Sequence, residues 1–133
     1  MPRTLIAPLL AEIDGCLVVE DDTIIRLDIE ETLRALGLTA VFGAGSVAAA
    51  LTALAREPVR CAVLDFLLRD ENSIAIAEAL MARGIPLLFL TAYGEDVALP
   101  AHLRHVRVLS KPFTTALLAE ALRQSVTPVE PTT

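Results

Sequence analysis

Acidic, hydroxyl and ammonium side chains stand at the ends of four short aliphatic runs in this sequence. Glu20 and Asp21 follow the first run, Asp65 closes the second, Thr91 closes the third, and Lys111 follows the fourth. If these runs are neighbouring parallel strands, their carboxyl ends meet in one crevice. The residue types gathered there predict a site for a divalent cation and a phosphoryl group.

The three acids in this set predict a magnesium site. Mg²⁺ prefers hard oxygen ligands and is typically held by one or two carboxylates together with phosphate oxygens. Glu20 and Asp21 at one strand end and Asp65 at another supply such ligands. Without a cation, three carboxylates within about 6 Å of one another would raise each other's pKa values. We therefore expect Glu20, Asp21 and Asp65 to bind Mg²⁺.

Asp65 is also the candidate nucleophile, because it is the single acid at its strand end, between Leu64 and Phe66. A carboxylate can attack phosphorus and form an aspartyl phosphate. The transferring phosphoryl group carries charge on its equatorial oxygens, which preorganised cations must neutralise. We expect Mg²⁺ and Lys111 to do so, while Thr91 donates a hydrogen bond from its hydroxyl group.

The composition excludes several classes of protein. The chain has 133 residues, of which 54% are hydrophobic, enough for one domain with a substantial core. Its formal net charge of −6 disfavours binding to nucleic acid or to anionic membranes. No apolar stretch approaches the roughly 20 residues that span a bilayer. Cys16 and Cys61 are expected to be buried thiols. We expect a cytoplasmic protein.

Short aliphatic runs alternate with longer amphipathic segments, which is typical of an α/β fold with a doubly wound parallel sheet. Strands are expected at about 16–20, 39–42, 61–65, 86–91 and 106–109. Helices are expected at about 23–36, 46–55, 73–83 and 114–125. The segment 96–105 is less determined, because Pro100 falls in its middle.

Local signals support the first two helices. In the first, Ile24, Leu27, Leu33 and Leu36 fall at helical spacing and predict an apolar face. Either Asp22 or Thr23 can cap its start, Gly37 fits a left-handed cap at its end, and Ser46 can cap the second helix. The pair Gly43 and Gly45 between them is interpreted as a turn rather than a nucleotide-binding loop, since the third glycine of that motif is missing.

The chain divides into a leader at 1–14, a folded domain at 15–126 and a tail at 127–133. The tail lacks periodicity and apolar mass, so we expect it to be disordered. The leader carries an apolar stripe that includes Leu5, Leu9 and Ile13. We expect a short helix packed on its own domain. The alternative is an arm for docking or for self-association, the latter giving a homodimer.

The combined motifs resemble the response-regulator receiver domain of bacterial two-component signalling. The acidic group at 20–22, the single Asp65, the triplet at 90–92 and the triplet at 111–113 stand in that family's order and spacing. The resemblance covers residues 15–125. It implies a flavodoxin-like (βα)₅ fold with strand order 2-1-3-4-5 and five helices, and a requirement for Mg²⁺.

The resemblance also implies roles for particular residues and partners. Asp65 would be phosphorylated by a histidine kinase or a phosphotransfer protein. Asp21 and Asp65 would bind Mg²⁺ directly, Glu20 directly or through water, and the backbone carbonyl of Leu67 would be a further ligand. Thr91 would move toward the phosphate when Asp65 is modified, and Lys111 would pair with a phosphoryl oxygen.

The sequence departs from the family in two places. The loop at 68–73 lacks the usual proline and glycine, and Val108 stands where many receivers carry an aromatic switch residue. The usual relay from Thr91 to that aromatic residue is therefore missing. The run 89–94 is similar to stand-alone receivers with Phe-Ala-Thr-Gly-Tyr at this place. We hypothesise that Tyr93, two residues after Thr91, takes over as the switch.

We expect a single-domain signalling switch rather than a dedicated enzyme, with output through an unknown downstream protein or a phosphorelay. Phosphorylation would shift two packings of the loops and of the face formed by 96–105, 106–109 and 114–125. One alternative is a degenerate receiver that acts as an interaction module without phosphorylation. The other is an aspartate-nucleophile phosphatase, disfavoured because the acidic pair precedes Asp65 and Leu67 stands where that class has a second aspartate.

Overall fold

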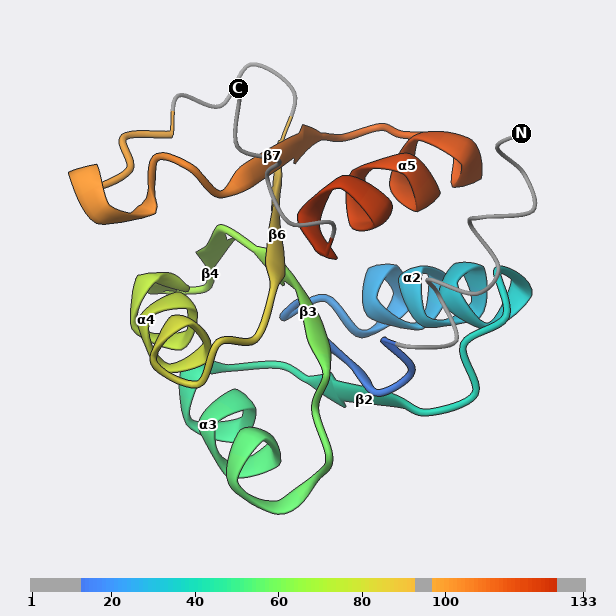
Figure 1. The fold of residues 1–133 in the computed structure, drawn as a ribbon, viewed down its shortest axis with the longest axis horizontal. Coiled ribbons are helices and arrows are strands. Elements are labelled where there is room, and N and C mark those ends of the chain that lie inside the picture. The colour runs from blue at the N-terminus through green and yellow to red at the C-terminus, as the bar shows by residue number, and fades with distance from the viewer. Residues whose placement is uncertain (1–12, 93–96, 127–133) are drawn as a thin grey trace, which may run out of the picture.

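A computed structural model describes residues 13–92 and 97–126, and the ribbon in Figure 1 shows a layered α/β fold. The central sheet has five parallel strands in the order β2-β1-β3-β6-β7. The strands are β1 (Cys16–Val19), β2 (Val41–Ala44), β3 (Cys61–Asp65), β6 (Leu87–Thr91) and β7 (Arg107–Ser110). In chain order this is 2-1-3-4-5, which confirms the predicted flavodoxin-like topology.

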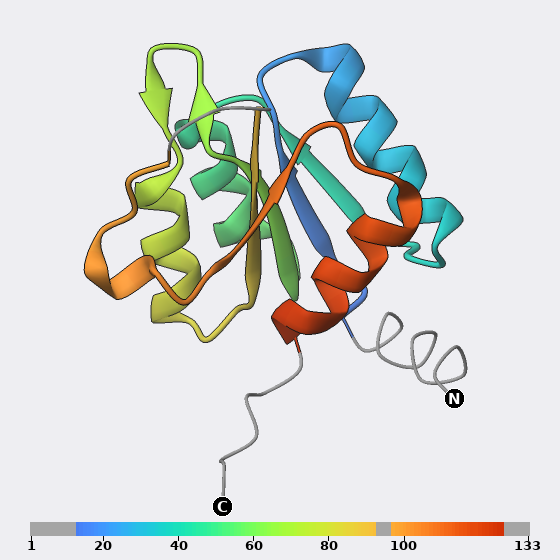
Figure 2. The same cartoon turned by 90° about the horizontal axis from the view of Figure 1, so that it is seen from above.

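Within residues 13–92 and 97–126, four α-helices cover the two faces of the sheet (Figures 1 and 2). They are α2 (Thr23–Ala35), α3 (Val47–Arg56), α4 (Ile74–Ala82) and α5 (Thr115–Val126). Helices α3 and α4 pack on one face and α2 and α5 on the other, each over its own hydrophobic cluster. The two clusters follow from strand alternation, since Leu17 and Val19 enter one and Cys16 and Val18 the other.

The expected caps form. The Asp22 carboxylate accepts hydrogen bonds from the backbone N–H groups of Ile24 and Ile25, each at 3.0 Å, and Ser46 caps α3. Gly37 follows α2 with a φ of 112°, a conformation that favours glycine. Both cysteines are buried free thiols on neighbouring strands.

The apolar face predicted for the first helix is wrong in its first half. Leu33 is buried, but Ile24 is 79% exposed and Leu27 is 50% exposed. Ile29 is buried in the core, but the inward positions beside it belong to Arg26 and Glu30, whose side chains are 20% and 11% exposed. The helix therefore turns charged residues toward the sheet next to the carboxyl ends of the strands.

The second strand lies two residues later than predicted, and Gly43 belongs to it rather than to a turn. The reason is Asp14, whose carboxylate accepts hydrogen bonds from the backbone N–H groups of Thr39 at 2.9 Å and Ala40 at 2.8 Å, and from the Thr39 hydroxyl. The N–H groups of Thr39 and Ala40 therefore bind the Asp14 side chain instead of β1, and the pairing of β2 with β1 starts at Val41.

Two further elements differ from the expectation. A short antiparallel hairpin follows the third strand, formed by β4 (Leu67–Leu68) and β5 (Glu71–Asn72), with Asp70 at a φ of 63° in its turn. Within 97–106 the structure has a single 3₁₀ turn, η1 (Ala101–Leu103), in place of the α-helix that the family resemblance implied. Pro100 directly precedes this turn, where it cannot donate a backbone hydrogen bond.

Among the described residues, none of the helices has the length and apolar character needed to cross a membrane. The leader and tail expectations, at 1–12 and 127–133, lie outside the described residues, whereas Ile13 is buried in the cluster beneath α2 and α5.

We expect Asp14→Ala to lower the free energy of unfolding by about 1–2 kcal/mol, since it removes the acceptor of hydrogen bonds that join the start of β1 to the start of β2. The hydrogen bond from Thr39 holds the pKa of Asp14 below its ordinary value. The carboxylate therefore contributes stability above its unfolded-state pKa, and that contribution is lost as pH falls through the folded-state value. Urea unfolding between pH 3 and pH 7 measures both effects.

The control is Asp14→Asn, which keeps one carbonyl oxygen and does not titrate. It should lose less stability than Asp14→Ala. Because neither variant titrates at this position, the difference between their free energies of unfolding should not change with pH. Equal stability of all three proteins at pH 7 would contradict the proposed role of Asp14.

Candidate functional site

The register of the sheet brings the predicted strand ends together. In that register Asp65 at the end of β3 lies opposite Leu90, and Thr91 at the end of β6 lies opposite Ser110. Glu20 follows β1 directly, and its backbone N–H donates to the carbonyl of Ala44 at 3.0 Å. The hairpin and the first turn of α2 lie along this same edge of the sheet, at the top of Figure 2. The edge therefore gathers side chains from four strands.

Glu20, Asp21 and Asp65 form a carboxylate cluster at this edge, with one oxygen from each lying within 4.8 Å of the others. Glu20 is 2% exposed and Asp65 is 8% exposed, while Asp21 is half-buried. Oxygen ligands of this kind at this spacing suit Mg²⁺. The donor set therefore fits the ion predicted from the sequence, with Asp21 on the more open side.

Lys111 lies between two of these acids. Its Nζ is 3.0 Å from Oε1 of Glu20 and 3.2 Å from Oδ1 of Asp65. The backbone N–H of Lys111 donates to the carbonyl of Thr91 at 2.7 Å, which fixes the chain where it leaves β7. The ammonium group of Lys111 thus reaches the carboxylate of Asp65, for which the sequence predicts the role of nucleophile.

Buried charge changes the pKa values of this group. Burial raises the pKa of Asp65 from its ordinary value of 3.8 to about 6, with Lys111 lowering it and Glu20 raising it. Burial opposes the charge of Lys111, but the hydrogen bond to Glu20 and the charges of Asp65 and Glu20 raise its pKa above the ordinary value. The site therefore favours a cation beside Asp65, and the protonated Lys111 supplies one.

Backbone contacts that the sequence did not reveal hold the acids in place. Oε2 of Glu20 accepts from the N–H of Asp22 at 3.1 Å, so both oxygens of this carboxylate are engaged. Oδ2 of Asp21 accepts from the N–H of Arg69 in the hairpin turn at 3.0 Å. The guanidinium of Arg26 donates to the carbonyl of Glu20 at 2.8 Å. Only the N-cap role of Asp22 had a sequence signal.

The remaining predicted residues are placed as follows. Thr91 is buried at the end of β6, next in the sheet to the strand that carries Asp65. Leu67 lies in β4, two residues past Asp65, with its side chain exposed. Val108 on β7 is exposed as well. Tyr93 lies outside the described residues.

The hairpin takes the place of the loop that lacks proline and glycine. It is held at one end by the Arg69 contact to Asp21 and at the other by Glu71, whose carboxylate accepts from the N–H of Val47 at the start of α3 at 3.0 Å. The hydroxyl of Ser73 donates to the carbonyl of Phe66 at 3.3 Å beneath it. The backbone after Asp65 is thereby tied to two neighbouring elements.

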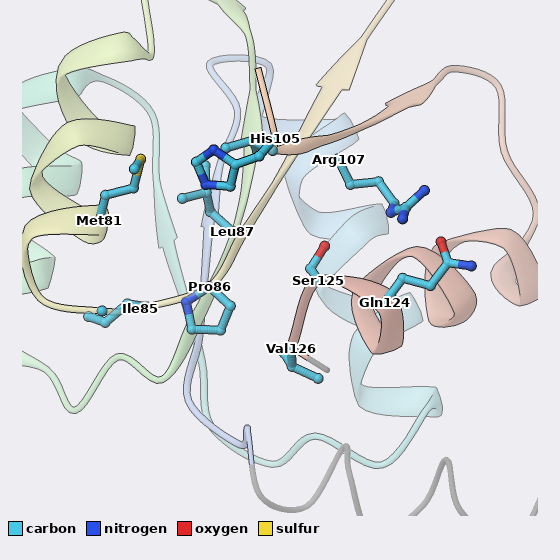
Figure 3. A pocket seen from close by; sticks show the side chains of 11 residues that line it. Met81, Ile85, Pro86, Leu87, His105, Arg107, Gln124, Ser125 and Val126 are labelled. Atoms are coloured by element: carbon cyan, nitrogen blue, oxygen red, sulfur yellow. The ribbon is translucent and has the colours of Figure 1, made fainter. Parts of the chain in front are cut away.

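A separate cleft of about 480 Å³ lies at the opposite end of the sheet, near the amino ends of β6 and β7 (Figure 3). Its walls include Met81, Pro86, His105, Arg107 and Gln124. None of its lining residues is a carboxylate, and it contains none of the residues of the acidic cluster. It is distinct from the candidate phosphoryl site.

The fold is of the flavodoxin-like class, and its candidate site is a cluster of carboxylates with one ammonium group. Residues 16–123 match the response regulator receiver domain, so this chain belongs to that family. Receiver domains are in general signalling switches rather than dedicated enzymes, they typically bind Mg²⁺ at an acidic site, and they interact with histidine kinases or phosphotransfer proteins.

Solved structures of similar proteins agree with this assignment. SdrG from Sphingomonas melonis Fr1 is 37% identical, with a TM-score of 0.75 over 86% of this chain and 98% of that one. SdrG in its BeF3-activated conformation, from Pseudomonas melonis Fr1, is 36% identical with a TM-score of 0.71 over the same shares, 86% and 98%. The PhyR receiver domain of Erythrobacter litoralis is 24% identical over 89% of this chain and 96% of that one, and its TM-score of 0.68 shows the shared fold. No curated protein matches the chain significantly.

We expect Asp65→Asn to stabilise the metal-free domain near neutral pH. Because the pKa of Asp65 is raised on folding, the folded protein binds more protons than the unfolded chain between about pH 4 and pH 6, so ionisation costs stability as pH rises through this window. The substitution removes that cost, about 1–3 kcal/mol at pH 7. Urea unfolding in EDTA at several pH values measures it.

The advantage of Asp65→Asn over the wild type should grow from pH 4 to pH 7 and then level off. Saturating Mg²⁺ should reduce it, since the ion stabilises the folded wild type through Asp65. A difference that does not change with pH would contradict the raised pKa.

Proposed function

We propose that this chain is a phosphoryl-accepting signalling switch that is modified on Asp65. The observation that carries the proposal is the position of Lys111, whose ammonium group lies 3.2 Å from Asp65 and 3.0 Å from Glu20 within the carboxylate cluster. A cation paired to a carboxylate of raised pKa in a site of hard oxygen ligands is suited to phosphoryl transfer. Membership of the receiver family supports the same reaction.

In the proposed reaction, a carboxylate oxygen of Asp65 attacks the phosphorus atom of a phosphohistidine on the donor protein. The phosphorus–nitrogen bond breaks as the acyl phosphate forms, and the imidazole leaves with the bonding electron pair. Lys111 stabilises the negative charge on an equatorial oxygen, and buried Thr91 offers a hydroxyl donor at the end of the neighbouring strand. Mg²⁺, when bound, neutralises further charge on the phosphoryl oxygens.

Three carboxylates would hold that ion: Asp21 and Asp65 directly, and Glu20 directly or through water. Glu20 already gives one oxygen to Lys111 and the other to the N–H of Asp22, which favours the water-mediated contact. The carbonyl of Leu67 completes the proposed ligand set, in the hairpin that Asp21 helps to fix.

The donor would be a histidine kinase or a phosphotransfer protein, and the output would be contact with a downstream protein or a phosphorelay. To shift the ratio of two conformations from 1:99 to 99:1, phosphorylation must favour one of them over the other by about 5.5 kcal/mol. The added charge on Asp65 would provide this difference through its interactions with the loops around the site. The BeF3-activated conformation of the similar protein SdrG supports the idea that this fold responds to a phosphoryl-like group.

Incubation with Mg²⁺ and acetyl phosphate tests the proposal. We expect intact mass to show the gain of one phosphoryl group on the wild type and no gain on Asp65→Asn, which lacks the nucleophile. Lys111→Met should slow the gain by about 10-fold or more, because the transition state loses a preorganised cation. Lys111→Arg keeps the charge but changes its geometry, so its rate of phosphorylation should lie between those of the wild type and Lys111→Met.

Two results would count against an aspartyl phosphate. One is labelling that persists in Asp65→Asn, which would place the phosphate elsewhere. The other is a wild type that gains no mass and binds neither Mg²⁺ nor BeF3⁻, which would leave a phosphorylation-independent interaction module.

Tyr93 provides a separate prediction from the sequence. If this aromatic residue acts as the switch in place of one on the fifth strand, Tyr93→Ala should change both the rate of phosphorylation and the affinity for a partner. Tyr93→Phe, which keeps the ring, should change them less. Stopped-flow labelling and titration with the cognate kinase measure the two effects, and the idea fails if Tyr93→Ala alters neither.

A further inference from the structure

The half of α2 nearest the acidic cluster turns charged residues inward. Arg26 and Glu30 lie one helical turn apart on the face toward the sheet, with Arg26 Nε 3.8 Å from Glu30 Oε2. Their side chains are 20% and 11% exposed, whereas Ile24 and Leu27 on the same helix face outward. Charged groups are costly to bury without a compensating interaction, so this arrangement calls for an explanation.

Arg26 reaches past the helix to the acidic cluster. Its Nη1 donates to the backbone carbonyl of Glu20 at 2.8 Å. Glu20 follows β1 directly, and the next residue is Asp21, so this carbonyl belongs to the peptide unit between two carboxylates of the cluster. Fixing that peptide unit fixes the directions in which both side chains leave the backbone.

The neighbouring strand β2 and the residue just beyond it leave room for this arrangement, because Gly43 in the strand and Gly45 after it carry no side chain. A Cβ at Gly43 would lie 2.3 Å from Oε2 of Glu30 and 3.2 Å from Nε of Arg26. A Cβ at Gly45 would lie 3.1 Å from Nη1 of Arg26. Neither glycine has a positive φ, so the need for glycine here is one of space. The charged pair thus lies directly over the backbone at the end of β2.

We propose that Arg26 is a positioning residue of the phosphoryl site: Glu30 holds its guanidinium over Gly43 and Gly45, and the guanidinium fixes the Glu20–Asp21 peptide so that both carboxylates face Asp65 and Lys111. This inference rests on the proposed function and adds to it a determinant of cation affinity outside the ligand set. Groups that orient metal ligands typically change metal affinity by about 10- to 100-fold when they are removed.

An arginine suits this role better than a lysine. The planar guanidinium presents several N–H donors in a fixed arrangement, so it can meet a carbonyl on one side and a carboxylate on the other. An ammonium group on the same helix position can satisfy the carbonyl with a single contact but cannot span both partners in the same way. Conservative replacement should therefore restore part of the function and not all of it.

The chain offers a matched control on the same helix. Arg34 also pairs with Glu30, with Nη2 3.8 Å from Oε1, but it lies on the far side of Glu30 from Glu20 and its side chain is 50% exposed. Arg34→Met therefore removes a positive charge from the same ion-pair network without touching the acidic cluster. A general effect of charge or of helix stability would appear equally in both variants.

The experiment compares Mg²⁺ affinity and BeF3⁻ affinity by calorimetry in the wild type, Arg26→Met, Arg26→Lys and Arg34→Met, with urea unfolding in EDTA run on each. We expect Arg26→Met to bind Mg²⁺ about 10-fold or more weakly. Arg26→Lys should recover part of that loss, and Arg34→Met should stay within about 2-fold of the wild type. Gly43→Ala displaces the Arg26–Glu30 pair without removing charge. Like Arg26→Met, it should bind Mg²⁺ more weakly than the wild type does.

The outcomes separate this inference from the proposed function. If the wild type and Arg26→Met bind Mg²⁺ and BeF3⁻ equally while Arg26→Met unfolds at lower urea, Arg26 is a structural link between α2 and β2 and the inference is overturned. The same conclusion follows if Arg34→Met weakens binding as much as Arg26→Met. If the wild type binds neither probe, the proposed function itself fails, and the positioning role fails with it.

Discussion

The structure depends on the compensation of negative charge at the carboxyl ends of its parallel strands. Two of the three clustered carboxylates are nearly inaccessible to water, and buried ions of like sign are strongly destabilising unless a counter-charge is present. Lys111 is that counter-charge, at 3.0 Å and 3.2 Å from two of the acids. Three negative groups against one ammonium still leave an excess of negative charge, which a divalent cation would offset.

The hydrophobic core on both faces of the sheet stabilises the fold and so offsets the cost of burying charge at the site. Hydrophobic clusters on both faces bury every residue of the three inner strands β1, β3 and β6. The ladder registers then leave no freedom in where the strand ends fall. The buried carboxylates Glu20 and Asp65 therefore lie together at the edge where the inner strands end.

The order of the elements could be predicted from the sequence because it depends on short-range patterns. Aliphatic runs predict the strands to within about two residues, and the positions of the acids, Thr91 and Lys111 at the ends of those runs predict that they lie at one edge of the sheet. The predictions that were wrong concern features set by tertiary contacts. The second strand begins later than predicted because Asp14 accepts hydrogen bonds from the N–H groups of Thr39 and Ala40. On α2, Arg26 and Glu30 occupy inward positions where the apolar face was expected. Helical periodicity counts apolar residues, so it cannot detect a charged pair that is buried because it has partners.

The hairpin after Asp65 also depends on tertiary contacts. No turn signal of the kind that favours two-residue hairpins stands at 67–72, and the turn places Asp70 in the left-handed region. The hairpin forms because Glu71 meets the N–H of Val47 at the start of α3 and because the N–H of Arg69 meets Asp21.

Glu20 and Asp21 are therefore held from two sides, by Arg26 of α2 on the backbone and by the hairpin on the Asp21 carboxylate. A change in the charge at Asp65 acts on carboxylates that are already tied to both elements. Any movement of the acids must then be shared by α2 and the hairpin, so the two elements that flank the site are coupled to each other through Glu20 and Asp21.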